Sequence, residues 1–135
     1  MPTTGGSTRS TAYGTITNTV LNLTDSGGTV VTMPAEIRGF QIFNPNPDMV
    51  YLKIWNDAAA NIVIANDEPD EVYELPGNQT VQRQSVEARP WVVHAPRVSY
   101  AITTQREAGG TAGGTACEGI LQFGCATLTR EFGLV

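Results

Sequence analysis

The sequence predicts an all-β protein that forms an antiparallel β-sandwich. If the sandwich has eight strands, we expect it to resemble a jelly roll. Short stretches rich in β-branched and aromatic residues recur with turn residues between them, about every ten residues, and no helix–strand alternation appears. The single lysine, the 14 glycines and the 8 prolines argue against a helical bundle. The 135 residues are the size of one domain, which is large enough to bury a core without disulfides or metals.

The chain is expected to begin with a flexible N-terminal arm over residues 1–11, which are polar and rich in Gly, Ser and Thr, followed by a single domain over 12–135. Residues 12–24 are β-prone but carry polar residues on both parities, which is typical of strands at a sheet edge. The expected strands, in order, are 12–24, 29–33, 37–43, 49–55, 61–65, 72–75, 79–88, 91–95, 97–104 and 117–123.

The clearest strand is 49–55, which alternates with period two and follows the turn Asn44-Pro45-Asn46-Pro47-Asp48. One face carries Val50, Leu52 and Ile54, and the other carries Tyr51, Lys53 and Trp55. The least clear stretch is 58–65. Asn56 or Asp57 would cap a short helix there, but the β-branched Ile62-Val63-Ile64 favours a loop and then a strand over 61–65.

Charge excludes some partners. The net charge is −5, with eight basic residues and no basic run, so neither a nucleic acid nor an anionic membrane surface is an expected partner. The N-terminal residues contain no apolar segment typical of a secretory signal, and no apolar run approaches the length of a membrane span. We therefore expect a soluble protein that is synthesised in the cytoplasm.

The reactive side chains predict no enzyme. His94 is the single histidine, and neither Cys117 nor Cys125 lies in a motif typical of a catalytic thiol. An extended segment between the two cysteines would hold them too far apart for a disulfide, so we expect two small, semi-buried apolar side chains. No catalytic residue, cofactor or metal site is predicted.

Two features of the sequence have more than one interpretation. The acidic loop 66–71 is oxygen-rich, but it lacks the spacing of a calcium-binding loop and is expected to be a solvated loop. Tyr51, Trp55 and Trp91 are either exposed aromatic side chains that stack on a sugar or a protein partner, or members of the core after a slip in strand parity.

Three segments in order, IFNPNPDMVYLKI, LPG at Leu75-Pro76-Gly77, and VHAPRVSYAITTQREAG, have a familiar pattern. Across residues 36–107 the chain resembles the small head decoration, or cement, proteins of tailed bacteriophages. The resemblance covers about half of the chain and consists of turns and strands that form a fold, not of catalytic motifs.

The resemblance implies a non-enzymatic virion protein, commonly a homotrimer, that binds the outer surface of the capsid and clamps neighbouring major capsid subunits. The arm, the aromatic side chains and an apolar tail are then the expected contacts with the partner: Thr3, Thr4, Arg9, Tyr51, Trp55, Trp91, Phe132, Leu134 and Val135. The alternatives are a tail, neck or fibre β-sandwich of a phage, and a module that binds a carbohydrate or a receptor.

Overall fold

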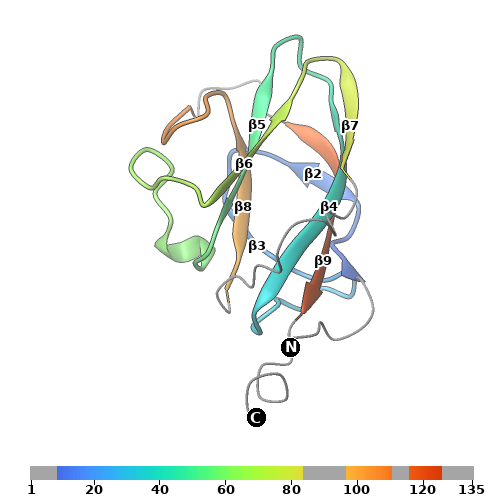
Figure 1. The fold of residues 1–135 in the computed structure, drawn as a ribbon, viewed down its shortest axis with the longest axis vertical. Helices are drawn as coiled ribbons and strands as arrows, with labels where there is room; N and C mark the ends of the chain where they lie inside the picture. The colour runs from blue at the N-terminus through green and yellow to red at the C-terminus, as the bar shows by residue number, and fades with distance from the viewer. Residues whose placement is uncertain (1–8, 84–96, 111–115, 126–135) are drawn as a thin grey trace.

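The computed structural model describes residues 9–83, 97–110 and 116–125, and these form nine strands and one short 3₁₀ turn (Figure 1). The elements are β1 (Arg9–Ser10), β2 (Gly14–Ile16), β3 (Leu21–Asn22), β4 (Ala35–Asn44), β5 (Val50–Trp55), η1 (Ala59–Asn61), β6 (Glu71–Leu75), β7 (Gln79–Arg83), β8 (Ser99–Thr103) and β9 (Cys117–Cys125).

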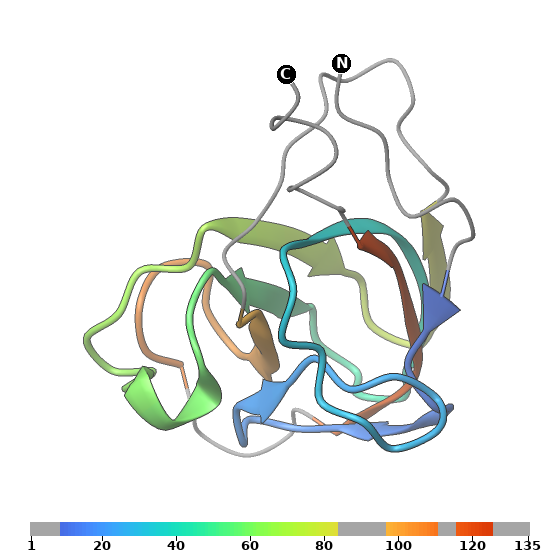
Figure 2. The same cartoon turned by 90° about the horizontal axis from the view of Figure 1, so that it is seen from below.

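The strands form two antiparallel sheets that pack face to face (Figure 2). The first sheet has the order β1–β9–β4–β7, and β2 pairs with β9 beside β1. The second sheet has the order β3–β8–β5–β6. The long strands β4 and β9 are central in the first sheet, whereas β2, β3, β6 and β7 lie at the sheet edges.

The pairing is nested. β5 pairs with β6, β4 with β7, β3 with β8, and β1 and β2 pair with β9, so the chain is one long antiparallel hairpin. Two further pairs, β4–β9 and β5–β8, roll this hairpin into two sheets. This is the topology of a jelly roll, and it confirms the fold class expected from the sequence.

The core lies between the sheets and is formed by the inward-facing half of each alternating strand. In β5 the inward residues are Val50, Leu52 and Ile54, as the period-two pattern predicts. They pack against the inward residues of β4 and β9 in a single large cluster whose members include Ile37, Phe40, Ile42, Leu121 and Phe123. One core therefore connects both sheets.

The end of the sandwich near the prolines is held together by one buried amide. The fully buried Asn44 side chain donates from Nδ2 to the main-chain oxygens of Leu75 (2.8 Å), Asp48 (3.0 Å) and Pro76 (3.2 Å). Its Oδ1 accepts hydrogen bonds from the main-chain nitrogen and the side-chain amide of Asn46. The turn after β4 and the turn between β6 and β7 are thus joined through Asn44, and the N–H of Asn78 adds a hydrogen bond to the main-chain oxygen of Asn46 at 3.0 Å.

Three expectations about the N-terminal part need correction. The flexible arm expected over 1–11 cannot include residues 9–11, because β1 pairs with β9 and Thr11 is buried, with its N–H donating to the oxygen of Leu121. The stretch 12–24 lies at the sheet edges, as expected, but it divides into β2 and β3, one in each sheet. The expected strand 29–33 contributes only the isolated bridge between Thr24 and Val30.

Beyond β5, the expectation of a strand over 61–65 is wrong. The chain instead forms η1 and a further turn, with the N–H groups of Asn66 and Asp67 both donating to the oxygen of Val63. The strand expected over 79–88 is observed as β7 up to Arg83. Its remaining residues, the strand expected over 91–95, and His94 lie outside the described residues.

Candidate interaction surface

The two sheets differ in what covers their outer faces. The outer face of the second sheet is covered by the segments 56–70 and 104–110 of the chain itself, seen in green and orange on the left of Figure 1. These segments are joined to each other and to the sheet: Gly109 N–H donates to the oxygen of Ile64, and Asp70 N–H donates to the oxygen of Ile54. The outer face of the first sheet instead leaves Phe43 exposed, with the exposed Tyr13 beside it.

Trp55 belongs to the covered face. Its side chain is only 2% exposed and packs with Ile64 and Ala101, while its indole N–H donates to the main-chain oxygen of Asp67 at 3.1 Å. Strand parity does not slip here, because Trp55 faces away from the main core, as the alternation predicts. The expectation of an exposed, partner-binding Trp55 is nevertheless wrong, because the following loop of the same chain folds back over it.

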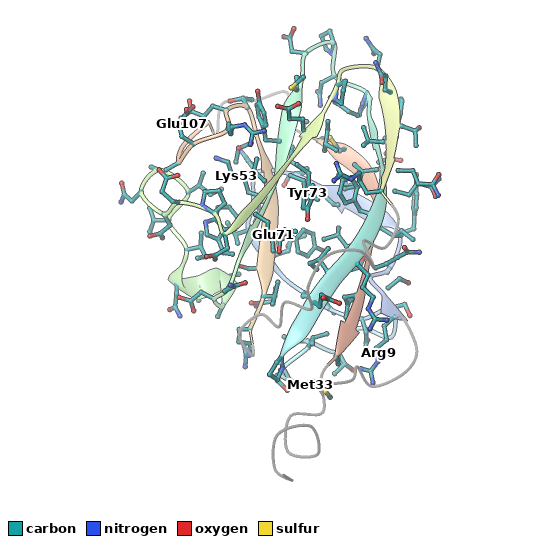
Figure 3. All side chains as sticks on the ribbon, in the orientation of Figure 1. Arg9, Met33, Lys53, Glu71, Tyr73 and Glu107 are labelled. Carbon is teal, nitrogen blue, oxygen red and sulfur yellow. The ribbon has the colours of Figure 1, made fainter. Side chains whose placement is uncertain are left out.

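Lys53 is fully buried on the same face, with an exposure of 0%. Its ammonium group donates to the main-chain oxygens of Glu107 and Gly109, so it fixes the turn 104–110 against the sheet. Figure 3 shows Lys53 and Glu107 on the same side of the second sheet. Burial lowers the pKa of Lys53, and the nearby charges of Glu68 and Glu107 oppose that shift. The role of this lysine is therefore structural.

The outer face of the first sheet, here called the open face, carries the outward side chains of four strands. Residues paired across neighbouring strands share a face, and the register places Thr15, Glu118, Phe43 and Thr80 in one row. The next row contains Ile120, Gln41 and Gln82. Glu118 is the one charged side chain among these seven. Such a surface, poor in charge and mixed with apolar side chains, is typical of the centre of a protein interface.

A shallow hollow lies at the middle of the open face. It has a volume of about 220 Å³ and is lined by Tyr13, Gln41, Phe43, Thr80, Glu118 and Ile120. Tyr13 is 70% exposed and its hydroxyl donates to Oε1 of Glu118 at 3.3 Å, while Phe43 is 42% exposed. The hollow thus presents two aromatic rings beside amide, hydroxyl and carboxylate groups.

Of the nine contact residues expected from the sequence, the structure describes Arg9, Tyr51 and Trp55. Arg9 is exposed at the sheet edge on β1 (Figure 3). Tyr51 is half-buried, with the guanidinium of Arg106 5.9 Å from the centre of its ring. The structure does not bring these three together on one surface. The other six expected contacts lie outside the described residues: Thr3, Thr4, Trp91, Phe132, Leu134 and Val135.

The acidic loop 66–71 uses two carboxylates to hold the backbone of the segment that precedes it. Oδ2 of Asp67 accepts from the N–H of Val63 at 2.6 Å, and Oδ2 of Asp70 accepts from the N–H of Asn56 at 2.7 Å. Over the described ranges, no group of three or more His, Cys, Asp or Glu side chains is placed to hold a metal ion. The loop therefore acts as a cover for Trp55.

The two cysteines lie at opposite ends of β9, and both are free and buried. Burial raises the pKa of Cys117 to about 11. Burial also raises the pKa of Cys125, although the nearby charges of Arg9 and Arg38 oppose the shift. A thiol with a raised pKa carries little thiolate at neutral pH, so neither cysteine has the properties of a nucleophile.

The sequence did not predict which outer face of the sandwich is open. The alternation of Gln41 and Phe43 with the buried Phe40 and Ile42 is visible in the sequence, and it places Phe43 on an outer face. What no local pattern shows is which outer face the rest of the chain leaves open, because that depends on contacts between distant segments.

Searches of family models, of curated proteins and of solved structures find no match to this chain. In the described part of the chain, no helix is sufficiently long and apolar to cross a lipid bilayer.

Proposed function

We propose that this protein is a head decoration protein of a tailed bacteriophage, which binds the outer surface of the capsid and stabilises the shell by bridging major capsid subunits. The role is structural and not enzymatic, and the molecule assembles as a homotrimer on the virion. The observation that carries the proposal is the open face: two central rows of side chains in which Glu118 is the one charged residue, with Phe43 and the neighbouring Tyr13 exposed, opposite a sheet covered by its own loops.

The covered second sheet gives this surface a rigid support. The open face is part of the sheet that contains the two longest strands, β4 and β9, and its inner side is packed on the single core. A rigid surface loses little conformational freedom when it binds, which favours affinity. Three copies joined as a trimer contact several capsid subunits at once, so weak individual contacts combine through effective concentration.

The proposal is tested by adding the purified protein to capsids that lack it. Electron microscopy measures occupancy, and heat-induced DNA release measures shell stability. We expect the wild-type protein to bind and to raise the release temperature. Phe43→Asp places a charge in the centre of the open face and should abolish binding, whereas the matched charge in an exposed loop on the covered side, Asn66→Asp, should leave binding intact.

Two results would contradict the proposal. Particles with equal heat resistance in the presence and absence of the protein would argue against a clamp, and binding that survives Phe43→Asp would argue against the open face. Mass photometry of the free protein and subunit counting on the particles test the trimer. A location of the copies on the tail or neck would favour a tail component in place of a decoration protein.

The hollow on the open face favours one second candidate, a module that binds a carbohydrate. The ring of Tyr13 and its neighbour Glu118 provide a stacking surface beside a hydrogen-bonding carboxylate, and Gln41 and Thr80 add an amide and a hydroxyl. Glycan binding by the wild-type protein that is lost in Tyr13→Ala and kept in Tyr51→Ala would support this candidate. Absence of binding to any glycan on an array would exclude it within the range of sugars tested.

A further inference from the structure

A second and larger hollow opens at one side of the sandwich, between the edge strands of the two sheets. It has a volume of about 390 Å³, which is within the range typical of ligand pockets, about 300–1,000 Å³. β2 forms one wall, the half-exposed Leu21 and Val30 contribute to the other, and the buried residues Tyr100 and Gly119 line its deep part. Its lining is mainly apolar. We call it the edge groove.

The edge groove borders empty space at Gly14, one of two paired glycines that line it. Gly14 pairs with Gly119, and Gly119 pairs in turn with Ile42, whose side chain points into the core. Gly14 has the same parity as the buried Ile16, so a side chain at Gly14 would point between the sheets, whereas a Cβ at Gly119 would meet the main chain of β4. A Cβ atom at Gly14 would have no atom within 4 Å, so the space beside this residue is empty.

The deep part of the edge groove contains an unused hydrogen-bond donor. Tyr100 is 6% exposed and belongs to the core cluster, yet its hydroxyl has no hydrogen-bond partner among the described residues. Burial raises the pKa of Tyr100, which keeps the hydroxyl protonated. The oxygen of this hydroxyl is not one of the fully buried polar atoms without a partner in the described part of the chain, so it is accessible from the edge groove that Tyr100 lines.

Two features of the walls indicate the chemistry of the occupant. β2 is paired on one side, with β9, so within the described structure its other edge is available to a further strand. Asp25 is the one charged residue that lines the edge groove, and its Oδ1 already accepts from the N–H groups of Gly27 and Thr29. A carboxylate at this position repels acidic ligands and favours neutral or basic ones.

From these observations we propose that the edge groove binds an extended, non-acidic peptide segment of a partner protein, which adds a strand at the free edge of β2, inserts one apolar or aromatic side chain beside Gly14, and accepts a hydrogen bond from Tyr100. The identity of that partner as a capsid subunit rests on the proposed function. Tyr13 lines both the edge groove and the hollow of the open face, so one partner can contact both.

The test uses two synthetic peptides with acetylated N-termini and amidated C-termini. Each has lysine at both ends and threonine on either side of a central residue. One has a central phenylalanine and the other a central aspartate. Backbone amide shifts of the ¹⁵N-labelled protein locate the binding site. We expect the phenylalanine peptide to shift the amides of Gly14, Thr15 and Tyr100, and the aspartate peptide to shift none of them.

Variants separate the groove from the rest of the surface. Gly14→Val fills the empty space with a residue that favours strands, and should weaken binding by roughly tenfold or more. Tyr100→Phe removes the hydroxyl alone and should weaken binding about threefold to tenfold. Tyr51→Phe on the second sheet, which removes a hydroxyl outside the groove, is the matched control and should bind like the wild type. Tyr100→Phe is nearly isosteric, so it keeps the test decisive if Gly14→Val does not fold.

Three outcomes would overturn the inference: no shift at the groove at millimolar peptide, equal shifts with both peptides, or shifts confined to the open face. The assay contains no phage particle. A failure here therefore leaves the decoration function standing, and particles that do not bind the protein leave the groove result standing.

Discussion

At the scale of single residues, Asn44 uses nearly all of its hydrogen-bonding capacity to join two turns. Asn44→Ala leaves the main-chain oxygen of Leu75 and the amide of Asn46 without their partner, and each buried unsatisfied group costs about 1–3 kcal/mol. We expect the free energy of unfolding to fall by at least about 2 kcal/mol in urea denaturation. The exposed Asn66→Ala should change it by less than about 0.5 kcal/mol, and equal effects of the two would contradict the role of Asn44.

The lowered pKa of Lys53 predicts how the stability of the protein depends on pH. In the folded protein its pKa lies below the usual 10.5, so between the lowered value and 10.5 the unfolded chain binds more protons than the folded one. The contribution of Lys53 to the free energy of unfolding therefore rises with pH between its lowered pKa and 10.5. Compared with Lys53→Met, the wild type should gain stability as the pH rises toward 10.5, as measured by urea unfolding of both proteins. Other titrating groups are common to both and cancel, and a constant difference would contradict the prediction.

At the scale of strands, the facing glycines of β2 and β9 are not equivalent. A Cβ at Gly119 would lie 2.1 Å from the main-chain oxygen of Gln41, so Gly119→Ala forces apart the central strands β4 and β9. We expect a loss of about 3 kcal/mol or more in the free energy of unfolding. Gly14→Ala meets open space and should be neutral or slightly stabilising, because alanine restricts the unfolded chain. Thermal melts of the two variants compare them directly, and equal melting temperatures would contradict the different surroundings of the two glycines.

Strand β5 and the segment after it show how much of the fold can be predicted from the sequence. The two faces of β5 were predictable, because period-two alternation depends on the local backbone alone. The segment after β5 was not. Ile62-Val63-Ile64 suggested a strand, but Ile64 packs on Trp55 from the covering segment, so its apolar character serves packing and not pairing. Only contacts across the fold, such as the hydrogen bond from Trp55 to Asp67, reveal that this face is covered and the opposite one open.

At the scale of the whole molecule, one core joins both sheets, and we expect the protein to unfold in a single cooperative transition. Separate melting would have to split the cluster that contains Leu52 of the second sheet and Leu121 of the first. Differential scanning calorimetry should give equal calorimetric and van't Hoff enthalpies. Two resolved transitions, or a van't Hoff enthalpy well below the calorimetric one, would contradict this expectation.

The hydrogen bond from Leu121 N–H to the hydroxyl of Thr11 spans 110 residues of sequence. Because the hairpin is nested, its outermost pair closes only after the inner pairs have brought both ends together. Such non-local closure slows folding, and sandwich proteins of this kind fold in milliseconds to seconds, not microseconds. During that interval β9 and its apolar side chains are unprotected, so newly made chains are most prone to aggregate before their last strand has found the first.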